Sequence, residues 1–176
     1  MRIGICGKMC SGKSTLAKII TGKFSEDEYK IDSFASKIYE IAYDLFQMKE
    51  KDRHLLQQIG TKMREINSNI WIEYLTHKHK DDVHIIIDDV RYINEANTLK
   101  KNGYFLIKLN ISNELQETRI KLLYENSDQH LNKRNHDSET SLDMLNDDIF
   151  DLIINVDDDN IEEIVSNKLL EKALPK

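Results

Sequence analysis

The stretch GICGKMCSGKSTLAKII, residues 4–20, is the most informative part of this chain. Residues 7–14 fit the pattern G-x-x-x-x-G-K-[ST], which binds nucleotide phosphates when a strand precedes it and a helix follows it. An apolar strand is expected over residues 2–6, and a helical pattern continues to about residue 20. The stretch therefore predicts a phosphate-binding loop between the first strand and the first helix of a P-loop fold.

The residue types within this loop each have a chemical reason. Gly7 and Gly12 let the backbone turn tightly, so that successive N–H groups point at phosphate oxygens. Lys13 is expected to reach the β- and γ-phosphates, and Ser14 to bind Mg²⁺ through its hydroxyl. The other loop residues expected to contact the nucleotide are Lys8, Cys10, Ser11 and Thr15.

Composition excludes several classes of protein. At 176 residues and 40% hydrophobic, the chain has material for one core, and it has no apolar run near 18 residues that could cross a membrane. The N-terminus leads directly into a strand instead of a signal peptide, and Cys6 and Cys10 lack disulfide or metal spacing, so we expect a cytoplasmic protein. A net charge of −6 argues against a nucleic-acid polymer as partner.

Strands and helices are expected to alternate along the chain. Further strands are expected at 29–32, 83–89, 104–111 and 152–156, and helices at 33–48, 52–66, 69–78, 94–101, 113–124 and 160–174, with breaks near Gly60 and residues 67–69. Residues 125–139 are polar and aperiodic, which predicts a loop or a mobile arm. This order predicts a three-layer α/β P-loop NTPase fold, with a parallel sheet of about five strands and helices on both faces. Ligands of such folds bind at the carboxyl ends of the strands.

Two acids end the strand expected at 83–89. A carboxylate at this place can hold Mg²⁺ directly or through water, so Asp88 and Asp89 are both candidate metal ligands. One of the two could instead cap the helix that follows. The sequence does not say which acid serves the metal.

The six arginines stand out among many lysines, because a guanidinium binds phosphate through two parallel hydrogen bonds. Arg91, two residues after Asp89, is expected to bind an acceptor phosphate. Arg2 and Arg53 are expected to be surface or strand-start charges. The four arginines expected near loops or helix ends on the nucleotide side are Arg64, Arg91, Arg119 and Arg134.

The absence of GTPase motifs limits the classes of P-loop protein to which this chain could belong. Asp89 is followed by Val-Arg-Tyr instead of D-x-x-G, and no N-K-x-D occurs, which excludes a switch GTPase. A motor or AAA-type ATPase would need a longer chain and a sensor region, so a small P-loop kinase remains. An alcohol acceptor would need a carboxylate base such as Asp32, whereas a phosphate monoester is already nucleophilic and mainly needs cationic groups. The arginines favour the monoester.

Several stretches beyond the loop resemble the deoxynucleoside monophosphate kinases of bacteriophages and large DNA viruses. These are DSFASK at 32–37, G-T-x-x-R at 60–64 with Trp71, DVRYINEA at 89–96 and H-x-SETSLD at 136–143. The last stretch also resembles phosphomevalonate kinases. The resemblance implies transfer of the γ-phosphoryl group of ATP to a deoxynucleoside 5′-monophosphate (dNMP) with Mg²⁺, and a homodimer is compatible with the family.

The resemblance also implies roles for residues. Residues 1–176 would form one kinase domain, with an acceptor-binding region at about 33–79 and a lid at about 125–139. Lys13 and Ser14 would hold the donor and the metal, and Arg91 would face the acceptor phosphate. Arg119, Lys133 and Arg134 would close over ATP. The residues implied for catalysis are Lys13, Asp89, Arg91 and Arg119. Trp71 has an alternative as a core residue. The residues implied for acceptor binding are Asp32, Phe34, Arg64, Trp71, Asp88, Arg91 and Glu95.

This chain departs from the usual family pattern at two places. Tyr92 and Ile93 stand where Phe-Pro is common, and Ser36 stands where Asp and Pro residues often follow the Phe-Ala pair, so the preferred base could differ. Two kinds of alternative function stay open. One is a related small-molecule kinase that acts on phosphomevalonate or dephospho-coenzyme A, and the other is a nucleotide-binding regulator without turnover.

Overall fold

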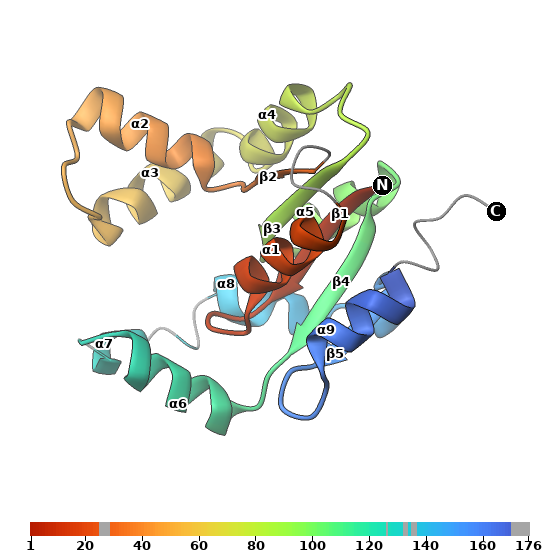
Figure 1. Ribbon diagram of the computed structural model, residues 1–176. Coiled ribbons are helices and arrows are strands. Elements are labelled where there is room, and N and C mark those ends of the chain that lie inside the picture. The colour runs from red at the N-terminus through yellow and green to blue at the C-terminus, as the bar shows by residue number, and fades with distance from the viewer. Residues whose placement is uncertain (25–28, 126, 132–133, 135–136, 170–176) are drawn as a thin grey trace.

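A five-stranded sheet forms the centre of the molecule in this computed structural model, which describes residues 1–24, 29–125, 127–131, 134 and 137–169 (Figure 1). Its order is β2-β3-β1-β4-β5, and every neighbouring pair is parallel. The strands are β1 (Arg2–Gly7), β2 (Lys30–Asp32), β3 (Ile85–Val90), β4 (Phe105–Asn110) and β5 (Leu152–Asn155). The architecture confirms the predicted α/β P-loop fold.

Helices cover both faces of the sheet. The α-helices are α1 (Lys13–Phe24), α2 (Ser36–Phe46), α3 (Arg53–Ile66), α4 (Ile70–Lys78), α5 (Ile93–Lys101), α6 (Asn113–Leu123), α7 (Ser127–Leu131), α8 (Asp137–Thr140) and α9 (Ile161–Ile164). Short 3₁₀ turns η2 (Ser141–Met144) and η3 (Asp147–Ile149) precede β5, and a π-helical segment η4 (Val165–Leu169) follows α9. Figure 1 shows α2 and α3 extending away from the sheet beyond the end of β2, and α6 and α7 extending away beyond the end of β4.

The side-chain alternation of β1 divides the core into two clusters. Ile3 and Ile5 belong to the cluster that contains Leu16 and Ile20 of α1. Cys6, on the opposite side of the same strand, belongs to the cluster that contains residues of α2, α3, α4 and α5. Because successive residues of a strand point to opposite faces, β1 is buried on both sides, as its apolar run predicts.

Several helix ends follow their sequence signals. The Asp52 carboxylate accepts hydrogen bonds from the N–H groups of His54 and Leu55 at the start of α3, and the Ser112 hydroxyl accepts one from Leu115 N–H at the start of α6. These side chains satisfy N–H groups that have no partner within the helix. Among the helices of the described part of the chain, none is long and apolar enough to cross a bilayer.

The break expected near Gly60 is wrong, because α3 runs through this residue without interruption. Gly60 is buried, and a Cβ atom there would lie 3.2 Å from Ile38 Cδ1 of α2. Its carbonyl oxygen accepts hydrogen bonds from Trp71 Nε1 and Arg64 Nη1, each at 3.3 Å. The glycine therefore allows α2 and α3 to pack closely instead of ending a helix.

Two other segments differ from the expected structure. The segment 125–139 contains the short helices α7 and α8, where a loop was expected, and residues 126, 132, 133, 135 and 136 lie outside the described residues. Lys133 is therefore not placed. The helix expected at 160–174 is observed as α9 and η4, and residues 170–174 lie outside the described part.

Two glycines provide a test of the packing. A Cβ atom at Gly4 would lie 2.7 Å from Leu106 Cδ2 and 3.1 Å from Leu99 Cδ1, whereas one at Gly22 of α1 would meet no atom within 4 Å. We expect Gly4→Val to lower the free energy of unfolding by roughly 2–3 kcal/mol through overpacking. Gly22→Ala should raise it by about 0.5–1 kcal/mol, because alanine favours the helix. Urea unfolding of both variants measures this, and an unchanged stability of Gly4→Val would contradict the packing.

Candidate functional site

The glycine loop turns from β1 into α1 as its sequence predicts. Gly7 has φ +154°, and a Cβ atom there would lie 2.7 Å from Ser11 Oγ and 3.0 Å from the carbonyl oxygen of Leu109. Gly12 has φ +97°, which other residues rarely adopt. Lys13 Nζ donates hydrogen bonds to the carbonyl oxygens of Gly7 at 2.8 Å and Lys8 at 2.7 Å. The Lys13 ammonium group therefore connects the end of the loop to its beginning.

The loop offers donors that fit a phosphate group. The Ser11 hydroxyl is fully buried and, within the described part of the chain, is the buried side-chain polar atom without a hydrogen-bond partner. The first N–H groups of α1, which begins at Lys13, have no acceptor within the helix and favour an anion. Burial, together with the nearby charge of Arg91, lowers the pKa of Lys13 to about 8. An anion at the loop would offset this charge, so these residues fit the nucleotide phosphates.

The two acids at the end of β3 have different surroundings. Ser14 Oγ donates to Asp88 Oδ2 at 2.7 Å, which brings together the hydroxyl and the carboxylate expected at a magnesium site. Asp89 instead accepts hydrogen bonds from the N–H groups of Phe34 at 2.7 Å and Ala35 at 3.0 Å. Burial raises the pKa of Asp89 to about 6 despite these bonds. The geometry therefore places Asp88 beside Ser14, while Asp89 fixes the turn after β2. A role of Asp88 as Mg²⁺ ligand stays a prediction.

A metal would need further ligands from the nucleotide. In the described residues, no group of three His, Cys, Asp or Glu side chains could hold an ion by itself. Mg²⁺ in P-loop enzymes is held by one or two protein groups, with phosphate oxygens and water completing the octahedron. Ser14 and Asp88 are compatible with such a partial site.

Two side chains of α6 donate hydrogen bonds to the backbone of the glycine loop. Gln116 Nε2 donates to the carbonyl oxygen of Met9 at 3.0 Å, and Arg119 Nη1 donates to that of Cys10 at 3.0 Å. Cys10 has φ +63°, a conformation that costs energy for a residue with a side chain, and these contacts help to hold it there. The structure thus brings Arg119 to the glycine loop, as predicted.

Arg134 does not lie against the loop in this structure. Its guanidinium contacts the carbonyl oxygen of Asn113 at 3.5 Å and Glu117 at 3.6 Å, both on α6. Thr15, another predicted nucleotide contact, is exposed in the first turn of α1. For both residues a nucleotide role stays a prediction.

A cavity of about 630 Å³ opens beside the loop and the end of β3. Its size is in the range of small-molecule binding sites. It contains side chains from α2, α3, the β3–α5 turn and the segment 124–139. The predicted site residues among those lining it are Phe34, Arg64, Asp89, Arg91 and Glu95.

Glu95 fixes the turn from which Arg91 projects. Its side chain is 3% exposed, and Oε2 accepts hydrogen bonds from the N–H groups of Arg91 at 2.9 Å and Tyr92 at 3.1 Å. Oε1 lies 3.4 Å from Arg64 Nη2, and the Arg64 guanidinium lies 4.7 Å from the centre of the Tyr92 ring. Burial and the nearby Asp89 raise the pKa of Glu95 to about 7.

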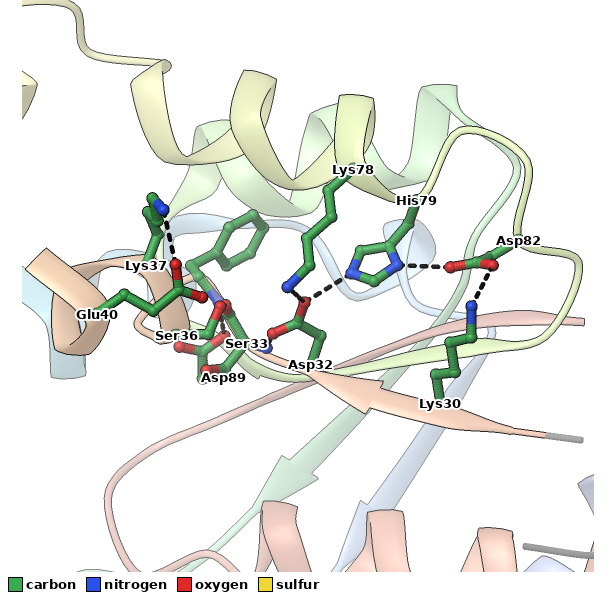
Figure 2. A network of polar contacts seen from close by, with 11 residues as sticks. Lys30, Asp32, Ser33, Ser36, Lys37, Glu40, Lys78, His79, Asp82 and Asp89 are labelled. Atoms are coloured by element: carbon green, nitrogen blue, oxygen red, sulfur yellow. Dashed lines mark hydrogen bonds and ion pairs between the residues drawn. The ribbon is translucent and has the colours of Figure 1, made fainter. Parts of the chain in front are cut away.

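Asp32 belongs to a separate polar network (Figure 2). Its Oδ2 accepts hydrogen bonds from Lys78 Nζ at 2.8 Å and lies 2.6 Å from His79 Nε2, while His79 Nδ1 lies 2.6 Å from Asp82. Burial acts to raise the pKa of Asp32, but the hydrogen bonds from Lys78 and His79 outweigh it and lower the pKa to about 2. The network ties β2 to the end of α4, and Asp32 is not among the residues lining the cavity.

Trp71 lies in the core. Its side chain is 2% exposed, and Nε1 donates to the carbonyl oxygen of Gly60 at 3.3 Å. Like Asp32, it is not among the residues lining the cavity. An acceptor-binding role for these two residues stays a prediction.

The expectation for Arg53 is wrong, because this residue lines the cavity instead of the outer surface. Its Nη1 lies 2.7 Å from His130 Nδ1 of α7, and its guanidinium lies 4.8 Å from the centre of the Tyr124 ring. A signal for this was present in the sequence. Arg53 shares one face of α3 with Gln57, Thr61 and Arg64, and these three residues also line the cavity.

Comparisons with known proteins agree with this fold. A family model described as "AAA domain" matches residues 3–142, which is more than half of the chain. Comparison with proteins of curated function gives no match. Among solved structures, shikimate kinase from Bacteroides thetaiotaomicron is similar, with a TM-score of 0.62, 16% identity and 99% of each chain covered.

Two further solved structures show the same similarity. Shikimate kinase from Acinetobacter baumannii, solved with shikimate, has a TM-score of 0.55 at 16% identity, and covers 98% of this chain and 92% of its own. A sugar kinase from Janibacter sp. has a TM-score of 0.57 at 14% identity, with 96% and 92% covered. At such identities the likeness establishes the fold alone.

The buried carboxyls of Asp89 and Glu95 should make stability depend on pH. Their pKa values of about 6 and about 7 exceed the ordinary values of 3.8 and 4.5, so the folded state binds more protons than the unfolded state between about pH 4 and pH 7. The free energy of unfolding should therefore fall as pH rises through this window. The lowered pKa of Asp32 contributes stability that is lost only below about pH 4.

Glu95→Gln tests this dependence. Removing the titrating group should flatten the decrease by on the order of 1–3 kcal/mol across the window. Urea unfolding at several pH values between 4.5 and 7.5 measures the slope. Glu50→Gln, an exposed site, is the control and should keep the wild-type slope. A Glu95→Gln slope equal to that of the wild type would contradict the assignment.

Proposed function

Because this chain belongs to the AAA domain family and carries its glycine loop beside an arginine-lined cavity, we propose that it is a kinase that transfers the γ-phosphoryl group of ATP to a dNMP. The observation that carries this proposal is the position of Arg91. It projects from the end of β3, borders the cavity, and contacts Glu139, which in turn accepts a hydrogen bond from Met9 of the loop. A guanidinium between a phosphate loop and a cavity suits an acceptor that itself carries a phosphate.

The chemistry of the cavity suits a nucleotide. Arg53, Arg64 and Arg91 supply positive charge for a phosphate group. Tyr39 and Tyr124 also line the cavity, and aromatic rings of this kind can stack on a planar base. A dNMP combines these two features, a charged phosphate and a flat heterocycle.

The carboxylates of this region favour a phosphate acceptor over an alcohol. An alcohol acceptor needs a general base within reach of its hydroxyl. Asp32 is held by Lys78 and His79 apart from the cavity, and Asp89, which does line the cavity, accepts two backbone hydrogen bonds. A phosphate monoester needs no such base, because its oxygens are already nucleophilic.

Different residues of the chain would bind the donor, the metal and the acceptor during phosphoryl transfer. Bound ATP supplies the phosphoryl group, and Mg²⁺ neutralises charge on its phosphates. The loop N–H groups and Lys13 would bind the donor, and Ser14 with Asp88 would hold the metal. Arg91 would orient the acceptor phosphate, and Arg119 would add positive charge at the loop. The segment 125–139 would act as a lid that excludes water from the site.

Turnover measurements decide between this function and its rivals. ADP formation should depend on a dNMP, and should be slower with phosphomevalonate, dephospho-coenzyme A or shikimate as acceptor. Faster reaction with one of those acceptors would assign the chain to that kinase class. ATP binding without acceptor-dependent ADP formation would instead indicate a nucleotide-binding regulator.

Arg91→Ala tests the acceptor site within this assay. We expect kcat/KM for the preferred dNMP to fall about 100-fold or more, because a positioned phosphate contact is lost. ATP affinity should change much less. Lys18→Ala, an exposed cation on α1, is the matched control and should keep wild-type kinetics. Equal dNMP kinetics in Arg91→Ala and wild type would refute the role of Arg91.

A further inference from the structure

Glu139 is a nearly buried carboxylate at the centre of the site. It belongs to α8, and its side chain is 5% exposed. Oε2 accepts a hydrogen bond from Met9 N–H at 2.6 Å, and Oε1 forms an ion pair with Arg91 Nη1 at 2.5 Å. One acidic side chain thus joins the glycine loop to the arginine at the end of β3.

The two groups that donate hydrogen bonds to Glu139 are of the types that bind phosphoryl groups in proteins. Met9 is the third residue of the loop whose N–H groups bind phosphate oxygens, and Arg91 carries the planar guanidinium suited to phosphate. Glu139 also lines both cavities beside the loop, one of about 140 Å³ along Gly7 and Lys8, and the one of about 630 Å³ that contains Arg91. It therefore stands between the donor side and the acceptor side of the site.

The charge of Glu139 has a clear effect on its surroundings. It lies near the positive charges of Lys13 and Arg91, and its charge partly opposes the lowering of the Lys13 pKa caused by burial and Arg91. The phosphates of ATP would bring their own negative charge to the same cations. A carboxylate and a phosphoryl group cannot both accept from Met9 N–H and Arg91 without strong repulsion.

We propose that Glu139 is an internal anion that occupies the phosphoryl position until the donor nucleotide displaces it. Displacement frees Arg91, so donor binding strengthens binding of the acceptor phosphate. Binding of the two ligands is therefore coupled, and the coupling is reciprocal. This inference rests on the proposed function only for the identity of the acceptor, because the competition at Met9 N–H concerns the donor alone.

Calorimetric titration with a non-hydrolysable ATP analogue tests the displacement. Glu139→Gln keeps the shape of the side chain and an oxygen that can accept from Met9 N–H, but removes the charge. We expect it to bind the analogue about tenfold tighter than the wild type. Asp143→Asn removes another carboxylate beside the loop, paired with Lys8 at 2.9 Å but half exposed, and should change affinity less than about fivefold.

A second titration measures the coupling. In the wild type, the preferred dNMP should bind about tenfold tighter when the ATP analogue is present, and in Glu139→Gln this ratio should approach one. If Glu139→Gln binds the analogue no tighter than the wild type, or more weakly, the proposal is overturned, because Glu139 then only positions Arg91. If Glu139→Gln does not fold, Glu139→Asp, which is too short to reach both donors, replaces it with the same expected direction.

The two proposals can fail separately. Tighter binding of the ATP analogue by Glu139→Gln, with no dNMP binding or turnover, would support the displacement and refute only the dNMP acceptor. Acceptor-dependent turnover of dNMP, with unchanged analogue affinity in Glu139→Gln, would support the kinase and refute the displacement. Absence of analogue binding in both proteins would refute both.

Discussion

The position of β1 at the centre of a parallel sheet is the constraint on which the site depends. Because β1 lies between β3 and β4, the loops that follow these three strands open side by side at one edge. The loop after β1 carries the phosphate-binding glycines, β3 ends in Asp88 and Asp89, and the helix after β4 carries Gln116 and Arg119. Burial of β1 on both faces and its pairing with β3 and β4 fix the position of the strand that leads into Gly7.

The site concentrates charge where burial is costly. Three carboxylates, Asp89, Glu95 and Glu139, lie in the same region as Lys13 and Arg91. Burial lowers the pKa of Lys13 and raises the pKa values of Asp89 and Glu95, which favours the neutral form of each group. Backbone N–H groups satisfy the three carboxylates, which makes this arrangement tolerable in the absence of ligand. Such shifted groups are typical of functional sites. The network of Asp32, His79 and Asp82 is different, because its groups pair with each other and fasten β2 to the end of α4.

Local signals are enough to predict the sheet and the conformation of the glycine loop. The glycine loop, the acids after the second buried strand, and Arg91 beside them all lie in short stretches whose geometry the backbone dictates. The spacing of Arg53, Gln57, Thr61 and Arg64 places them on one face of α3. The direction in which this face points depends on how α3 packs against α2, where Gly60 lies close to Ile38, and no local pattern shows that contact. Glu139 lies within the H-x-SETSLD stretch, but no local pattern indicates its role, because its partner Met9 is 130 residues away in the sequence. Asp32 ends a strand at the carboxyl edge of the sheet, where active-site carboxylates are expected. Its carboxylate is instead paired with Lys78 and His79 at the end of α4, which no local pattern shows.

In the proposed function, one site binds two nucleotides across a shared phosphate position, with the glycine loop on one side and Arg91 on the other. An adenosine joined to a deoxynucleoside through five phosphates would span both halves, and its affinity measures whether they form one site. We expect this compound to bind at least about 100-fold tighter than the non-hydrolysable ATP analogue, because its second nucleotide binds at a high effective concentration once the first is bound. Binding no tighter than the ATP analogue would contradict a shared two-nucleotide site.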